Sequence, residues 1–114
     1  MPGVLTVNLE AGMPTVEIAK SRMTAALRSA KAQRAVALKL IHGYGSSGHG
    51  GRIRTGVRRE LGLMKQSGTI KEVVFGEEFS PFEECARRAL QLCPELARDR
   101  DYTRCNQGIT VVIL

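Results

Sequence analysis

Hydrophobic and polar residues follow two different periods along the first half of the chain. Alternation at every second position predicts a strand over residues 5–9, and a nearly continuous apolar run predicts a buried strand over residues 35–41. Apolar spacings of three and four residues predict one helix after Thr15 as its N-cap and a second helix beginning near Arg52. The Ser-Gly pair at 67–68 closes this second helix.

The second half of the chain continues this alternation with one interruption. A short apolar run predicts a third strand over residues 70–75. A third helical pattern begins at the Ser-Pro pair 80–81 and is interrupted at Pro94, because proline cannot continue a helix. Residues 99–102 form a polar connection, and the β-branched run 109–114 predicts a last strand.

The order βαβαβ(α)β predicts a single α/β domain over residues 1–114. Alternating strands and helices favour a mostly parallel sheet with helices packed on it, and we expect a two-layer sandwich. A chain of 114 residues is long enough for one ordinary hydrophobic core but not for two. The expected core residues are Val36, Leu38, Leu40, Val57, Leu61, Val111 and Ile113.

The composition is that of a soluble globular protein, with 43% apolar and 25% charged residues. No apolar run approaches the roughly 20 residues of a membrane span, and the first residues lack a secretion signal. We therefore expect a cytoplasmic protein without a membrane partner. Three cysteines without a Cys-x-x-Cys pair fit reduced thiols better than a disulfide framework.

The charge is distributed unevenly along the chain. The net charge is +6, but residues 1–71 hold 12 basic and three acidic residues, which gives +9. Residues 72–114 hold five basic and eight acidic residues, which gives −3. A strongly basic half suits a polyanionic partner, and nucleic acid is the commonest one.

A glycine-rich loop lies between the second predicted strand and the basic second helix. Glycines at this point expose backbone N–H groups at the positive end of a helix dipole, an arrangement that binds phosphate. Five basic residues on the helix suggest a large anion, such as a nucleic-acid backbone. The candidate phosphate-binding residues are Gly43, Tyr44, Gly45, Gly48, His49, Gly50, Gly51, Arg52, Arg54, Arg58, Arg59 and Lys65.

Other uses of this loop fit the sequence less well. Residues 43–48 match the Gly-x-Gly-x-x-Gly dinucleotide fingerprint, but the chain is too short for a second nucleotide-binding half. An NTPase phosphate loop is excluded because His49-Gly50 replaces the required Lys-Ser/Thr pair. The spacing of His42 and His49, seven positions apart, is not a zinc-ligand pattern. We expect neither a metal nor another cofactor.

The motifs and their order resemble those of the Smr (small MutS-related) domain family. Residues 41–45, Ile-His-Gly-Tyr-Gly, resemble its His-Gly-x-Gly motif, and residues 12–19 and 106–112 are similar to its first-helix entry and closing strand. The resemblance spans nearly the whole chain. It implies a compact α/β sandwich like the C-terminal domain of translation initiation factor three. It also implies binding of DNA or RNA, with endonuclease activity in several members.

The first family motif, Leu-Asp-x-His-Gly, is altered in this chain. The matching residues 7–11 are Val-Asn-Leu-Glu-Ala, so Asn8 and Glu10 replace the acid and the histidine that the family uses in cleavage. Asparagine cannot act as a base, and a glutamate could do so only with a raised pKa. His42, Glu10 and Asn8 are the catalytic candidates of a metal-independent endonuclease whose activity we expect to be weak or absent. Neighbouring parallel strand ends should place these three residues together.

Nucleic-acid binding without strong sequence preference is therefore the main functional hypothesis. Aromatic residues make up only 4% of the chain, which gives little material for a base-stacking platform. Two alternatives stay open. The basic face could bind an acidic protein, or the glycine loop could bind a mononucleotide. The sequence does not distinguish DNA from RNA or indicate an oligomeric state.

Overall fold

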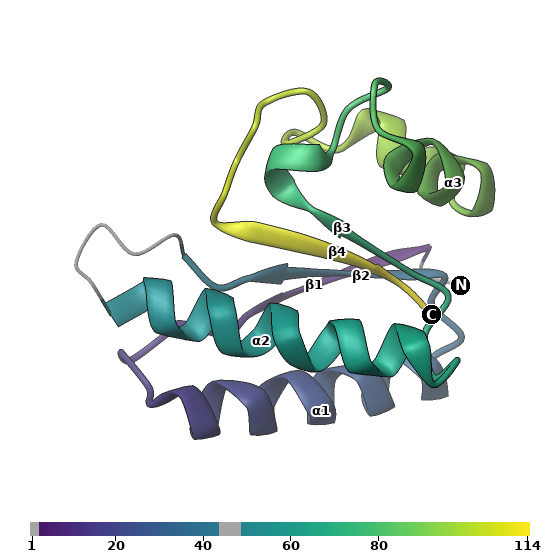
Figure 1. Ribbon diagram of the computed structural model, residues 1–114. Coiled ribbons are helices and arrows are strands. Elements are labelled where there is room, and N and C mark those ends of the chain that lie inside the picture. The colour runs from purple at the N-terminus through teal and green to yellow at the C-terminus, as the bar shows by residue number, and fades with distance from the viewer. Residues whose placement is uncertain (1–2, 44–48) are drawn as a thin grey trace.

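The computed structural model describes residues 3–43 and 49–114, and in this part the chain forms a small α/β domain with four strands and three α-helices (Figure 1). The expected α/β class is confirmed. In chain order the elements are β1 (Val4–Asn8), α1 (Val16–Ala32), β2 (Ala37–Ile41), α2 (His49–Gln66), β3 (Glu72–Phe75), the 3-10 helix η1 (Gly76–Glu78), α3 (Glu84–Leu92), the 3-10 helix η2 (Pro94–Arg98) and β4 (Ile109–Ile113).

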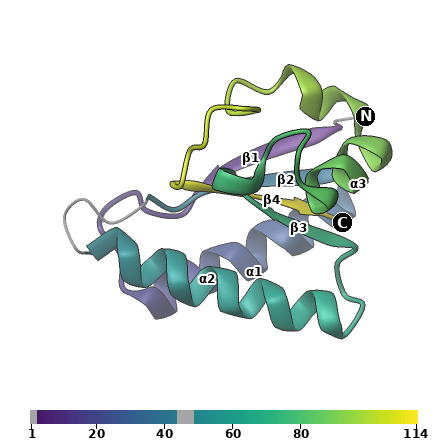
Figure 2. The same cartoon turned by 45° about the horizontal axis from the view of Figure 1, so that its top comes forward.

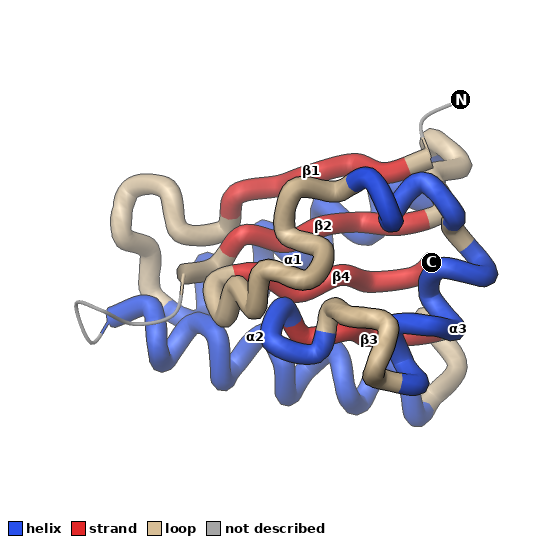
Figure 3. The backbone as a smooth tube through the Cα atoms, turned by 90° about the horizontal axis from the view of Figure 1, so that it is seen from above, coloured by secondary structure: helices blue, strands red, loops and turns tan. Residues whose placement is uncertain are grey.

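The sheet is mixed, with the strand order β1-β2-β4-β3 (Figure 3). Strands β1 and β2 are parallel, whereas β4 is antiparallel to both of its neighbours. The expectation of a mostly parallel sheet is thus corrected: in the described chain, one of the three strand pairs is parallel. Because β3 opposes β4, it points the same way as β1 and β2, so these three strands end at one edge of the sheet.

The connection between β3 and β4 explains the direction of the last strand. The sequence predicted a single helical crossover here. In the structure a further segment, residues 99–108, runs from the end of η2 back to the start of β4, and it is here called the return leg. Gly76, directly after β3, packs so closely against the Asn106 carbonyl, shortly before β4, that no Cβ would fit at position 76. The connection therefore starts and ends at the same edge of the sheet, and β4 must run back against β3.

Helices cover both faces of the sheet (Figures 1 and 2). Helices α1 and α2 pack on one face, where Met23, Leu38 and Leu61 belong to a single apolar cluster. On the other face α3 and η2 pack against a second cluster, which includes Phe79 and Val111. The two-layer sandwich is therefore corrected to three layers, because the third helical segment covers the face that a two-layer fold leaves open.

Six of the seven expected core residues are buried, and Val36 is the exception. This residue is 39% exposed. Val36 precedes β2, at the end of the sheet where its carbonyl accepts a hydrogen bond from Leu114. An apolar residue at this position continues the hydrophobic run in the sequence without lying between the layers.

Most element ends agree with the sequence pattern, but the third helix does not. The Thr15 side chain caps α1 by accepting a hydrogen bond from the Ile18 N–H at 3.2 Å. Helix α3 begins at Glu84 instead of at the predicted Ser-Pro pair 80–81. The Ser80 hydroxyl accepts a bond from the Phe82 N–H at 3.4 Å, so these residues form a turn before the helix.

Candidate nucleic-acid interface

The ends of β1 and β2 lie side by side at one edge of the sheet, as the sequence predicted. Asn8 pairs with Ile41 in the sheet, and the Leu9 N–H donates to the Ile41 carbonyl at 2.7 Å. The Glu10 carboxylate lies against Gly43, where an added Cβ would collide with it. Gly43 also has a φ of 77°, a backbone conformation that favours glycine. The backbone thus brings the segments that carry Asn8, Glu10 and His42 together.

His42 is fully buried at this edge, and both ring nitrogens are hydrogen bonded. Nδ1 donates to the Gly43 carbonyl at 2.7 Å, since a carbonyl oxygen can only accept. Nε2 must then accept the proton of the Thr110 hydroxyl, 2.8 Å away. Burial lowers the pKa of His42 to about 4; the hydrogen bond to Gly43 opposes this shift, and the charges of Arg58 and Arg54 reinforce it. The imidazole is therefore neutral at neutral pH.

The side chains of the catalytic candidates have structural contacts. The His42 ring has no free nitrogen with which to exchange a proton with a substrate. The Asn8 side-chain oxygen accepts a bond from the Glu10 N–H at 2.9 Å, which stabilises the turn after β1. The structure gives both Asn8 and His42 a role in holding the strand ends, and the assignment of a catalytic role to them stays a prediction.

Arg58, one of the predicted phosphate ligands, is mostly buried against the same edge. Its guanidinium makes two hydrogen bonds of 2.7 and 2.8 Å to the Glu77 carboxylate, and Nε donates to the Thr110 hydroxyl oxygen at 3.1 Å. It also stacks over the Phe75 ring, with its central carbon 4.2 Å from the ring centre. The hydrogen bonds from Arg58 hold the pKa of Glu77 below its ordinary value. Arg58 is therefore a neutralised structural residue.

The other basic residues of α2 fall into two groups. Arg54 donates to the Gln107 side-chain oxygen at 3.1 Å, and Lys65 forms an ion pair of 2.6 Å with Glu72. Arg52 and Arg59 are exposed, and neither makes a hydrogen bond or ion pair within residues 3–43 and 49–114. Of the five predicted cations on this helix, these two are the exposed ones that have no hydrogen-bond or ion-pair partner in the described ranges.

The uneven distribution of charge along the sequence gives the two faces of the fold different net charges. Helix α1 carries four basic residues and one acidic residue, and α2 carries five and one. Both helices cover the same face of the sheet, whereas the acidic second half of the chain forms β3, β4 and the opposite layer. The surface formed by α1 and α2, here called the α1/α2 face, is consequently basic.

Part of the predicted loop cannot be compared with the structure. Tyr44, Gly45 and Gly48 lie outside the described residues, and so does the side chain of His49. His49, Gly50 and Gly51 begin α2, and the first turn of this helix contains no acidic residue. Phosphate binding by the loop itself stays a prediction.

A buried ion cluster on the α3 side was missed by the sequence interpretation. Lys39 of β2 forms ion pairs with Asp99, at 2.8 Å, and with Asp101. Burial tends to lower the pKa of Lys39, but hydrogen bonds and charge attraction from the two aspartates outweigh it and raise the pKa. The segment 99–102, predicted as a polar connection, thus anchors the return leg to the sheet. A single lysine inside the apolar run 35–41 was the available signal.

In the described ranges, 3–43 and 49–114, no three His, Cys, Asp or Glu side chains are grouped to hold a metal ion, and the three cysteines form no disulfide. No helix in these ranges is long and apolar enough to cross a membrane. No protein-family model matches the chain, and no curated protein sequence or solved structure matches it either.

Proposed function

We propose that this domain binds nucleic acid through the sugar-phosphate backbone, with the α1/α2 face as the contact surface. The observation that carries the proposal is the pair Arg52 and Arg59. The two residues are seven positions apart, so they lie on the same side of α2, and both are exposed. Their guanidinium groups are well suited to phosphate oxygens, which they can bind with two parallel hydrogen bonds.

Binding of this kind is expected to be largely independent of sequence. Phosphate contacts position a protein on a nucleic acid but carry no direct information about the bases. Only two tyrosines, three phenylalanines and no tryptophan are available for stacking on bases. The basic face favours encounter with any polyanionic strand, DNA or RNA.

A salt titration tests the proposal. The affinity for a labelled duplex of about 20 base pairs would be measured by fluorescence anisotropy at several salt concentrations. A plot of the logarithm of the binding constant against the logarithm of the salt concentration should have a slope of about −0.9 for each phosphate neutralised. The double variant Arg52→Ala/Arg59→Ala should weaken binding and flatten this slope. Its control, Arg98→Ala/Arg100→Ala, removes two exposed arginines from the α3 side and the same net charge. No binding at low salt, or equal loss in both variants, would contradict the proposal.

The resemblance to the Smr family forms part of the same proposal. Its support is the order of three motifs along the sequence together with the βαβα order of the first half of the fold. A cytoplasmic location is proposed with it, because the free thiols of Cys85, Cys93 and Cys105 suit a reducing compartment. An acidic protein partner and a mononucleotide ligand are the alternatives. A pull-down with and without nuclease, and calorimetry with mononucleotides, distinguish them from the proposal.

We do not extend the proposal to cleavage. The buried His42 ring is engaged at both nitrogens, and Asn8 and Glu10 replace the acid and histidine of the resembled motif. A nicking assay on supercoiled plasmid and on structured RNA should therefore give little or no turnover. Robust turnover that is lost in His42→Ala would show that the ring leaves its buried position to act on substrate.

A further inference from the structure

A cavity of about 630 Å³ lies between the first turns of α1 and α2 on the basic face. This volume is within the roughly 300–1,000 Å³ of typical ligand sites. Three of its lining residues are basic and none is acidic. The cavity is lined by Val16, Lys20, Gly51, Arg52, Thr55, Gly56 and Arg59.

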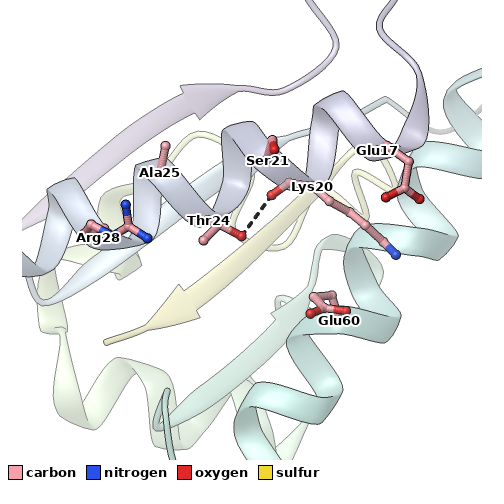
Figure 4. Close-up of a pocket in the computed structure, with 7 residues that line it drawn as sticks. All are labelled: Glu17, Lys20, Ser21, Thr24, Ala25, Arg28 and Glu60. Atoms are coloured by element: carbon pink, nitrogen blue, oxygen red, sulfur yellow. Dashed lines mark hydrogen bonds between the residues drawn. The ribbon is translucent and has the colours of Figure 1, made fainter.

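Gly56 brings the two helices close together at the floor of this cavity. A Cβ at position 56 would lie only 2.7 Å from Val16 Cγ1 and 3.6 Å from Lys20 Cε. The stem of Lys20 therefore lies over Gly56 and directs the ammonium group toward α2. Figure 4 shows this side chain extending from α1 toward the neighbouring helix. A lysine of α1 thus joins Arg52 and Arg59 of α2 around one cavity.

Two acidic residues flank Lys20 where the first cavity meets a second one. A second cavity, of about 460 Å³, continues between the helices and is lined by Lys20 together with Glu17 and Glu60 (Figure 4). Arg28 lies at the far end of this second cavity, about two helical turns from Lys20. Glu60 lies one helical turn after Gly56 on α2 and places a negative charge where the groove continues past Lys20, whereas Glu17 lies one turn before Lys20 on α1.

We propose that a stretch of nucleic-acid backbone with consecutive phosphates occupies the first cavity, with Lys20 as a phosphate ligand beside Arg52 and Arg59. Glu60 marks the end of this binding track. Three cations that converge on one cavity suit the closely spaced charges of a phosphodiester chain better than the scattered carboxylates of an acidic peptide. This inference rests on the proposed function and adds a residue of α1 that the sequence did not indicate.

The variant Lys20→Ala tests the inference against Lys71→Ala, which removes an exposed lysine next to β3. Lys20→Ala should weaken binding of a labelled duplex several-fold and make the salt slope shallower by about 0.9, whereas Lys71→Ala should change neither. If the unaltered protein binds and the two variants behave alike, this inference is wrong and the proposed function stands. If the unaltered protein does not bind, both fail.

For a second variant, the inference predicts that the affinity for the duplex changes in the opposite direction. Glu60→Gln removes a carboxylate from the end of the track and should strengthen duplex binding, whereas Glu83→Gln on the α3 side should not. Equal effects of the two would contradict the proposed track. A polyglutamate peptide, tested in parallel, should bind more weakly than the duplex and respond less to Lys20→Ala. An equal or greater response of the peptide would overturn the choice of ligand.

Discussion

The Thr110 hydroxyl oxygen lies 2.8 Å from Nε2 of His42 and so links the start of β4 to the end of β2. The same oxygen accepts a hydrogen bond from Arg58 Nε of α2 at 3.1 Å. Because Nδ1 of His42 donates its proton to the Gly43 carbonyl, the neutral ring can only accept at Nε2, so the threonine hydroxyl donates to His42 while it accepts from the arginine. One hydroxyl group therefore joins two strands and a helix at the edge from which the glycine loop leaves.

The buried His42 should make stability depend on pH. Its pKa is lowered to about 4 from an ordinary 6.5, so the unfolded chain binds a proton between these values and the folded chain does not. The free energy of unfolding should therefore fall as the pH drops from 6.5 to 4, by about 3 kcal/mol. Urea unfolding at pH 7, 6, 5 and 4.5 measures this change.

The variant His42→Gln tests whether this pH dependence of stability comes from His42. It should flatten the stability profile above about pH 5.5; nearer their ordinary pKa values of 4.5 and 3.8, Glu77 and Asp101 take up protons in the unfolded chain before the folded one and add a slope of their own. His49→Gln removes the other histidine of the chain and should leave the slope in place. A slope that persists in His42→Gln would mean that the ring is not buried as described.

Thr110→Val should destabilise the fold by about 1–3 kcal/mol, because the buried Nε2 of His42 and Nε of Arg58 both lose their hydrogen-bond partner. Thr110→Ser keeps the hydroxyl and should recover most of this loss. Thermal unfolding of the two variants at pH 7 measures the difference. Equal melting temperatures for the two variants would show that the hydroxyl group contributes little to stability.

Two glycines of α2 should respond differently to alanine. Gly62 has open space where a Cβ would lie, so Gly62→Ala should stabilise the protein by about 0.5–1 kcal/mol through helix propensity. Gly56→Ala gains the same propensity but places its Cβ 2.7 Å from Val16 Cγ1. Its stability should therefore lie below that of Gly62→Ala in denaturant titrations. A higher value would contradict the close approach of α1 and α2.

The ion cluster on the α3 side should be sensitive to loss of its cation. Lys39→Ala leaves the carboxylates of Asp99 and Asp101 without their shared cation and should cost about 3–5 kcal/mol. The exposed Lys71→Ala should stay within about 0.5 kcal/mol of the unaltered protein. Chemical denaturation compares the two. A small loss in Lys39→Ala would indicate that the cluster adds little net stability.

The sequence predicted the strands and helices well, because the patterns that specify them involve residues close together in the chain. The period of the apolar residues and the cap at Thr15 depend on neighbours within one or two turns. The direction of β4 was not predictable in this way. It depends on the contact of Gly76 with Asn106, between residues 30 positions apart, which no periodicity records.

The sequence predicted only part of the candidate site, because only part of it depends on local patterns. The order of strand and helix is enough to place His42 at the end of β2 and the arginines on α2. Which cations are free is a tertiary property: Arg58 and Arg59 are neighbours in sequence, yet Arg58 binds Glu77 and Arg59 lines the open cavity. The role of Lys20 requires the packing of α1 against α2.

Mapping of amide chemical shifts tests the central claim, that the α1/α2 face binds nucleic acid, most directly. A ¹⁵N-labelled sample would be titrated with a short duplex at low salt and again at high salt. The account predicts perturbations concentrated in residues 16–20 and 51–59, little change in α3, and loss of the perturbations at high salt. Perturbations centred on α3, or none at low salt, would contradict it.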